Sequence, residues 1–340
     1  MKNEKAAMRN WTPTNPAFDP NEPMQVGGQA VIEGVMMRAK GMIATAVRNP
    51  DGEIVVKKEE YRSLIERHPS LNIPVLRGAI GLVEMMIIGI KTLNYSAEVA
   101  LGNDGVASKE KGDEEGGMMT LPLMAAFLAA LALGVAVFFF LPLFVVTRVF
   151  SIEQDPVLFN LVAGAIRVAI LIAYLYSISL AKDIHRLFQY HGAEHKAVFT
   201  FEQNAPLEVA SAMTYTRFHP RCGTSFVLLV MFVSIVLFAL LDTAVLSVHG
   251  SLSLTLRLCT HIPLIPVVGG ISYEVLKYSA RHVATPIGRI IVAPGLWLQT
   301  ITTKEPDESQ MEVSLAAIKA ALRLDAEPVG VRREEAAVRV

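Results

Sequence analysis

The sequence predicts a mainly α-helical membrane protein: a polytopic bundle of about four spanning helices, with a small N-terminal β unit and an interfacial amphipathic helix. Hydrophobic residues make up 52% of the 340 residues, charged residues make up only 19%, and the mean hydropathy is +0.41. This balance is typical of membrane proteins. Two further observations support the prediction: long apolar runs, and a clustering of lysine and arginine in the stretches between them.

Composition also excludes some classes of protein. The net charge of −1 argues against a nucleic-acid partner. Residues 1–23 are polar and proline-rich, and we expect a disordered N-terminus without a cleaved export signal. The two cysteines, Cys222 and Cys259, are too few for a disulfide framework, so we expect reduced thiols.

Residues 24–60 are predicted to form the small β unit. Short β-prone runs at residues 42–47 and 53–56 flank an Asn-Pro-Asp-Gly sequence at residues 49–52, which is a strong turn signal. The glycine-rich segment at residues 27–38 has neither the G-x-G-x-x-G spacing nor a P-loop. No nucleotide site is therefore expected there.

Residues 73–101 are predicted to form an amphipathic helix that lies in the membrane interface. This otherwise apolar or small-residue segment carries charges seven residues apart, at Arg77, Glu84, Lys91 and Glu98. On a helix this spacing produces one narrow polar stripe, which also suits a helix packed under the bundle. A fifth membrane insertion is the alternative, which the cost of centrally placed charges disfavours. The acidic, glycine-rich residues 102–117 that follow predict a flexible linker.

Residues 118–281 are predicted to form the membrane bundle. Their four apolar runs approach or exceed the about 20 residues that a spanning helix needs. The runs cover residues 118–146, 157–181, 222–241 and 258–273. Arg167 interrupts the second run, and we expect it either to pair with Asp242 or to extend toward the membrane surface.

The distribution of basic residues predicts the orientation of the bundle. Most of them follow the second or the fourth run: Lys182, Arg186, Lys196, Arg217, Arg221, Lys277, Arg281 and Arg289. The connections on the opposite side carry mainly Arg148 and Arg257. Because basic residues collect on the cytoplasmic side, both termini are predicted to be cytoplasmic.

Residues 286–324 are predicted to contain an interfacial segment and a C-terminal helix. Trp297 suits the interface between membrane and water. Asp307 or Glu308 suits the start of the helix because an acidic side chain caps exposed N–H groups. Residues 325–340 are expected to form a tail.

The chemistry-bearing motif is His191-Gly192-Ala193-Glu194-His195, in the predicted cytoplasmic loop between the second and third spans. Histidines four residues apart lie on one face of a helix, where both can bind one metal ion. With Glu194 the motif reads H-x-x-E-H, the order found in inverted zincins. We therefore predict His191 and His195 as ligands of Zn²⁺ or another divalent metal, and Glu194 as the catalytic general base.

The remaining metal ligands are left open by the sequence. Glu274, 79 residues after His195, is the predicted third ligand, and Glu202 is its rival. His219 and Cys222, together with the two histidines, would instead give a closed structural site. There are plainer interpretations of each feature. A motif this short can arise by chance, residues 219–224 could form a simple turn and helix cap, and Glu274 could pair with a nearby basic residue.

Four segments together resemble the YqhQ-like family of bacterial membrane proteins. They cover residues 27–38, 191–196, 219–226 and 294–307. Members of this family have no assigned function and are often described as predicted metal-dependent enzymes. The resemblance spans roughly residues 24–322. It implies a location in the bacterial cytoplasmic membrane and a shared set of residues: His191, Glu194, His195, His219 and Cys222. It implies no substrate.

Two hypotheses for the function follow. The first is a multi-pass, metal-dependent hydrolase-like protein whose site faces the cytoplasm, with a peptide or lipid-linked substrate that approaches along the bilayer. The second is a non-enzymatic scaffold, or a module that binds membrane protein partners, with a structural metal site. A transporter is a weaker third possibility because the spans contain few charges.

Overall fold

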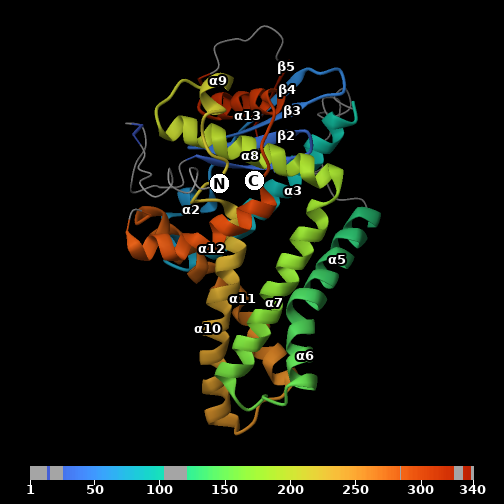
Figure 1. Ribbon diagram of the computed structural model, residues 1–340, viewed down its shortest axis with the longest axis vertical. Helices are drawn as coiled ribbons and strands as arrows, with labels where there is room; N and C mark the ends of the chain where they lie inside the picture. Colours follow the sequence, from blue (N-terminus) through green and yellow to red (C-terminus); the bar gives the residue numbers. More distant parts are fainter. Residues whose placement is uncertain (1–13, 16–25, 103–120, 284, 325–331, 338–340) are drawn as a thin grey trace.

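The computed structural model describes residues 14–15, 26–102, 121–283, 285–324 and 332–337. The predicted disordered N-terminus and the acidic linker lie almost entirely outside the described residues. Within them, the chain is mainly helical and has two parts: a head of strands and helices, and a bundle of long helices that extends from one side of the head (Figure 1). The predicted fold class is confirmed.

The head is built on a five-stranded sheet. Its strands are β1 (Gly27–Val31), β2 (Gly34–Ala39), β3 (Met42–Arg48), β4 (Ile54–Glu60) and β5 (Arg332–Ala337). The first four are antiparallel and lie in chain order, which confirms the predicted β unit. At the turn before β4, Asn49 Oδ1 accepts the N–H of Glu53 at 2.9 Å. β5 lies within residues 325–340, the expected tail, and pairs with β4 in parallel.

Helices cover both faces of the sheet. One face packs against α8 (Lys182–Glu202) and α13 (Glu308–Ala321), and the other packs against α3 (Leu76–Ala100). Successive strand residues point to opposite faces. Met37 therefore belongs to the core under α8 and α13, and Met36 to the core under α3, and both are fully buried.

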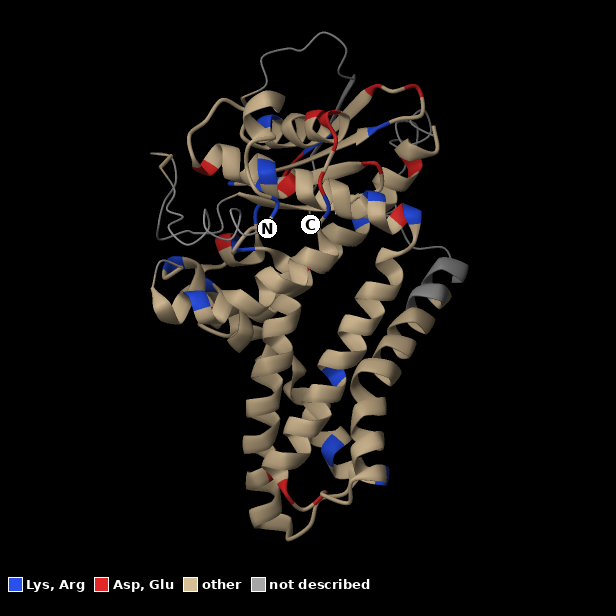
Figure 2. Ribbon diagram, in the orientation of Figure 1, with Lys and Arg blue, Asp and Glu red and all other residues tan. Residues whose placement is uncertain are grey.

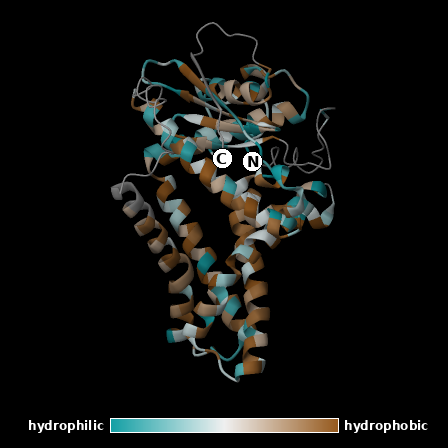
Figure 3. Cartoon of the chain, turned by 180° about the vertical axis from the view of Figure 1, so that it is seen from behind, coloured by the Kyte–Doolittle hydropathy of each residue, from teal (hydrophilic) through white to brown (hydrophobic). Residues whose placement is uncertain are grey.

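Four helices of the described residues are long and apolar enough to span a membrane, as predicted. They are Leu128–Val149, α7 (Pro156–Ser179), α10 (Gly223–His249) and α11 (Leu254–Arg281). The first of them consists of α5 (Leu121–Val135), the π-helical turn η3 (Ala136–Phe140) and α6 (Leu141–Val149). Charged residues gather in the head and are sparse along the bundle, whose ribbon is mostly hydrophobic (Figures 2 and 3). These apolar helices associate the chain with a lipid bilayer.

Helix α3 joins the head to the bundle. Tyr95 and Val99 are buried against the sheet, while Gly78, near its start, packs against α11. A Cβ added to Gly78 would lie 3.0 Å from Gly270 Cα, so the close approach of these helices needs glycine. α3 is not among the candidate spans. Its predicted place in the membrane interface stays a prediction.

The H-x-x-E-H motif lies on helix α8, in the connection between the second and third spans, and is helical as the metal-site prediction requires. The apolar side chains of Ala193, Ala197 and Val198 pack with the sheet and α13 in one buried cluster. This packing stabilises the segment as a helix and places it in the head.

The shorter elements are α2 (Leu64–Arg67), η2 (Pro69–Leu71), α9 (Val209–Ala212) and α12 (Pro286–Thr302). α12 lies between the head and the bundle (Figure 1).

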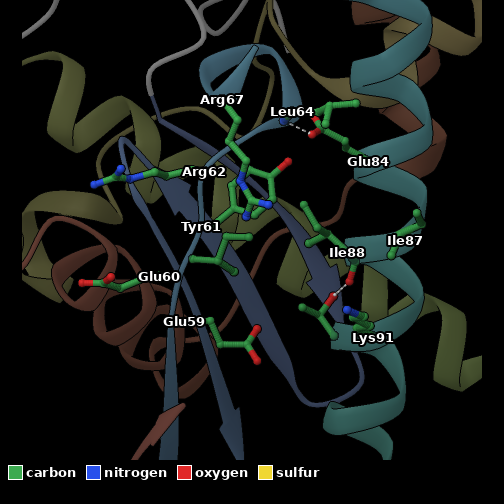
Figure 4. A pocket seen from close by; sticks show the side chains of 12 residues that line it. Glu59, Glu60, Tyr61, Arg62, Leu64, Arg67, Glu84, Ile87, Ile88 and Lys91 are labelled. Carbon is green, nitrogen blue, oxygen red and sulfur yellow. Dashed lines mark hydrogen bonds between the residues drawn. The ribbon is translucent and has the colours of Figure 1, made fainter. Parts of the chain in front are cut away.

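A pocket of about 190 Å³ lies between β4, α2 and α3 (Figure 4). Ile43 and Ile88 contribute apolar walls, and Arg67 and Glu84 are among the charged residues that line it. Glu84 also accepts the backbone N–H of Leu64 at 2.5 Å, which ties α2 to α3. None of the site residues predicted from the sequence lines this pocket.

Candidate metal centre

The structure brings His191, His195 and Cys222 together at the junction of head and bundle. The two imidazole rings, one helical turn apart on α8, have their centroids 4.5 Å apart. Cys222 is the residue that precedes α10, and its Sγ lies 3.3 Å from His191 Nε2. One potential ligand atom from each of the three residues lies within 4.8 Å of the other two. The backbone of two helices therefore positions a compact group of nitrogen and sulfur donors.

Backbone carbonyls orient both imidazoles. His191 Nδ1 lies 2.8 Å from the carbonyl oxygen of Thr302, and His195 Nδ1 lies 2.5 Å from that of Arg217. A carbonyl only accepts hydrogen bonds, so each Nδ1 carries the proton and each Nε2 carries a lone pair. Burial also lowers the pKa of His191 and His195, which favours the neutral form. Metal-binding histidines usually have this same arrangement.

Glu194 lies beside this group. Its Oε2 is 3.4 Å from His195 Nε2, and its carboxylate accepts the backbone N–H of Gly28 on β1. A Cβ on Gly28 would lie 3.1 Å from Glu194 Cγ and would collide with the carbonyl oxygen of Met36. Burial raises the pKa of the Glu194 carboxyl, against the smaller opposing effects of His191 and His219. The site therefore places a buried proton-accepting group next to the nitrogen and sulfur donors.

Gly192 allows the segment after α12 to cross α8. A Cβ at this position would collide with the carbonyl oxygen of Lys304. The crossing segment is held where the N–H of Lys304 donates to the carbonyl of Phe188 at 2.8 Å. It is also held by Arg217 Nη1, which donates to the carbonyl oxygen of Thr303 at 2.6 Å. The close crossing is what brings Thr302 next to the imidazole that it orients.

His219 and Glu202 form a separate buried group next to the three donors. His219 Nδ1 accepts the N–H of Arg221, so its Nε2 donates to Glu202 Oε2 at 3.2 Å. Glu202 also forms an ion pair with Arg221. Burial lowers the pKa of His219 to about 4, so this ring is neutral at pH 7. The His219 ring centroid is 5.6 Å from that of His195, but the ring nitrogens are directed to other partners.

Glu274, the predicted third ligand, lies elsewhere. It is on α11, and both of its carboxylate oxygens are bound by Arg77 of α3, at 2.6 and 2.5 Å. The backbone N–H of Val75 adds a third contact at 3.4 Å. The structure therefore places Glu274 in the contact between α3 and α11, and it groups Cys222 with the two histidines.

Several supporting residues were not singled out from the sequence. Gln299 holds His219 through two hydrogen bonds of 2.8 Å, one to its backbone N–H and one to its carbonyl oxygen. Gly28 contacts Glu194, and the carbonyls of Thr302 and Arg217 orient the imidazoles. Gly28, Gln299 and Thr302 lie in the segments that carry the family resemblance. That resemblance is the sequence feature that could have indicated their role. The role of the Arg217 carbonyl could not be predicted, because every residue has a backbone carbonyl whatever its side chain.

Fold and site together define a class: a helical, membrane-associated protein whose head carries a buried His–His–Cys group where it meets the membrane bundle. The chain belongs to the family described as "Protein of unknown function (DUF1385)", whose model matches residues 73–324. It is 36% identical over 315 residues to "Uncharacterized protein YqhQ" of Bacillus subtilis (strain 168), which covers 89% of this chain and 94% of that protein. The resemblance seen in the sequence is thus confirmed. No solved structure matches the chain.

Proposed function

We propose that this chain is an integral membrane, metal-dependent hydrolase-like protein, in which His191, His195 and Cys222 hold Zn²⁺ or another divalent transition metal. The observation that carries the proposal is the orientation of the two imidazoles. Each donates its Nδ1 proton to a backbone carbonyl. One ligand atom from each ring lies within 4.8 Å of the other and of Cys222 Sγ, and His191 Nε2 is 3.3 Å from that sulfur. A packed core has no need for three such donors facing one another.

The donor set favours Zn²⁺ among the common metals. Two imidazole nitrogens and one thiolate suit a borderline-soft ion, whereas Mg²⁺ and Ca²⁺ prefer oxygen ligands. Three protein ligands are also the number found in catalytic zinc sites, where a fourth position stays open. When bound, the ion would supply Lewis acidity for the activation of water.

In this proposal Glu194 is the group that accepts and returns a proton. Its carboxylate lies beside His195 but is not one of the three grouped ligands. The N–H of Gly28 holds it in place, and its buried surroundings exclude competing solvent contacts. The site lies where α8 of the head meets the start of α10. A peptide or lipid-linked substrate that approaches along the bilayer surface fits this location.

We further propose that the head and both termini face the cytoplasm of a bacterial cell. The basic residues that follow the second and fourth apolar runs lie at or near the head end of the bundle, whereas the loops at its far end carry fewer. This asymmetry matches the preference of basic residues for the cytoplasmic side. The relative from Bacillus subtilis supports a bacterial source.

A structural metal site is the second candidate, in line with a scaffold or a protein that binds membrane partners. Burial favours it: His195 is 2% exposed and Cys222 is 4% exposed. The cluster also connects α8, the start of α10, the end of α12 and the loop at Arg217. A metal there would hold the head on the bundle without any need for Glu194.

Replacing Glu194 with glutamine separates the two candidates. In the proposed hydrolase, Glu194→Gln keeps the metal and the fold but slows hydrolysis by at least about 100-fold, because a general base contributes roughly that much. The measurement is the release of products from a panel of peptides and extracted membrane lipids, followed by mass spectrometry. Glu312→Gln, at an exposed head carboxylate, is the matched control. Turnover that is absent in the wild type, or equal in wild type and Glu194→Gln, would support the structural site.

A further inference from the structure

A second group of charged residues lies among the spanning helices, away from the metal centre. Asp242 of α10 is fully buried, and its three hydrogen bonds all come from within the bundle. Its Oδ2 accepts from Asn160 at 2.7 Å and from Arg257 Nε at 2.8 Å, and its Oδ1 accepts from His261 Nε2 at 2.8 Å. Asp242 therefore has a full set of partners, with Arg257 as its cation.

Arg167, on the neighbouring helix α7, has no such partner. Its side chain is buried, with the residue 4% exposed, and none of its three guanidinium nitrogens has a hydrogen-bond partner among the described residues. The guanidinium lies over the rings of Phe139 and Phe238, 5.3 and 5.6 Å from their centroids. Arginine stays charged in proteins, so five N–H donors are buried without an acceptor. The sequence predicts that Arg167 either pairs with Asp242 or extends to the membrane surface. Among the described residues, Arg167 has no hydrogen bond to Asp242, and its side chain stays buried.

A π-helical turn in the first span supports a specific role for the surroundings of Arg167. Phe139 lies in η3, a π-helical turn inside the first span. Such turns are rare, and they occur frequently at functional sites. Phe238 also stacks on His261, with centroids 4.1 Å apart, so the same aromatic ring connects Arg167 with the Asp242 group.

The charges of this region do not balance. Asp242 attracts Arg167 electrostatically, but it is already bound to Arg257. Two arginines and one aspartate leave at least one positive charge uncompensated, whichever form His261 takes. An unpaired cation in hydrocarbon is costly, and residues of this kind usually mark functional sites.

We propose that Arg167 is the anchor of a membrane-embedded oxyanion site, which takes a monovalent carboxylate or phosphate group. A planar guanidinium with free N–H groups binds both anions through paired hydrogen bonds. Arg167 lies 11 residues after the start of α7, or about 17 Å along a helix, which is well inside the hydrocarbon layer of about 30 Å. The anion belongs either to a small solute or to an amphiphile whose apolar part shares the bilayer.

The test compares oxyanion binding to the full-length wild type and to Arg167→Gln in detergent and in nanodiscs. The probes are inorganic phosphate, decanoate and nanodiscs containing phosphatidylglycerol, read out by thermal unfolding and native mass spectrometry. We expect saturable binding of at least one probe, weakened at least about tenfold in Arg167→Gln, as loss of a charge-assisted bidentate contact implies. Arg148→Gln, at an exposed arginine near the end of α6, is the matched control and should bind like the wild type.

The pattern among the probes identifies the source of the anion. Binding of phosphate alone indicates a free solute, whereas binding of decanoate or phosphatidylglycerol indicates an amphiphile. If Arg167→Gln does not fold, Arg167→Lys replaces it, because lysine keeps the charge but loses the planar fork; it should also bind at least tenfold more weakly. The proposal is overturned if no probe binds the wild type, or if the Arg167 variant binds as tightly as the wild type.

Discussion

Replacement of His195 by alanine is expected to weaken zinc binding by at least about 100-fold. Loss of a residue that only supports a ligand costs about 10–100-fold in metal affinity, and loss of a ligand should cost more. The Arg217 carbonyl fixes the imidazole of His195. His219, whose ring centroid is 5.6 Å from that of His195, is engaged with Glu202 and does not replace it.

The measurement is a competition titration of purified protein with a chromophoric zinc chelator. His185→Ala is the matched control, because His185 is on the same helix but is exposed and outside the grouped donors. It should bind zinc like the wild type. If His195→Ala and His185→Ala had the same zinc affinity, α8 would not be the source of the ligands.

Replacement of Asp242 by asparagine is expected to destabilise the bundle by about 3 kcal/mol. The substitution keeps the shape of the side chain but removes the carboxylate that is bound to Arg257, and breaking a buried ion pair leaves an uncompensated charge. Both side chains are fully buried, so solvent does not screen the loss. Arg257 also donates to the carbonyl of Glu153 at 2.7 Å, and the end of the bundle should loosen with it.

Stability is measured as the free energy of unfolding in mixed micelles, by titration with a denaturing detergent. Glu312→Gln serves as the control, since its ion pair with Arg48 is in the exposed part of the head. An exposed pair contributes about 0–1 kcal/mol, so this variant should unfold close to the wild type. Equal losses for the two variants would contradict the role given to Asp242.

Local sequence patterns were sufficient to predict the architecture. The apolar runs predicted the four spans because a bilayer imposes a minimum length on each helix. The turn signal at residues 49–52 predicted the β unit because Gly52 can adopt its φ of 87° without strain. The packing of α8 on the sheet and the presence of strand β5 were not predicted, because the sheet and β4 are far away in the sequence from these segments.

In the candidate site, too, the local feature could be predicted from the sequence and the long-range contact could not. The pairing of His191 with His195 is local, and the i, i+4 spacing was enough to predict it. The third donor is a long-range contact, and the preference for Glu274 came from analogy with inverted zincins. The binding of the Glu274 carboxylate by Arg77 depends on the packing of α3 on α11. The position of Cys222 depends on where α10 begins.

The proposed metal centre requires that His191, His195 and Cys222 bind one metal ion. The most direct test is the metal content of the detergent-purified wild type by elemental mass spectrometry, beside His191→Ala, Cys222→Ser and Glu194→Gln. We predict close to one zinc or other transition metal ion per chain, lost on replacement of either ligand and kept in Glu194→Gln. The absence of bound metal from the wild type, even after supplementation with zinc, would contradict the binding of a metal ion by these three residues.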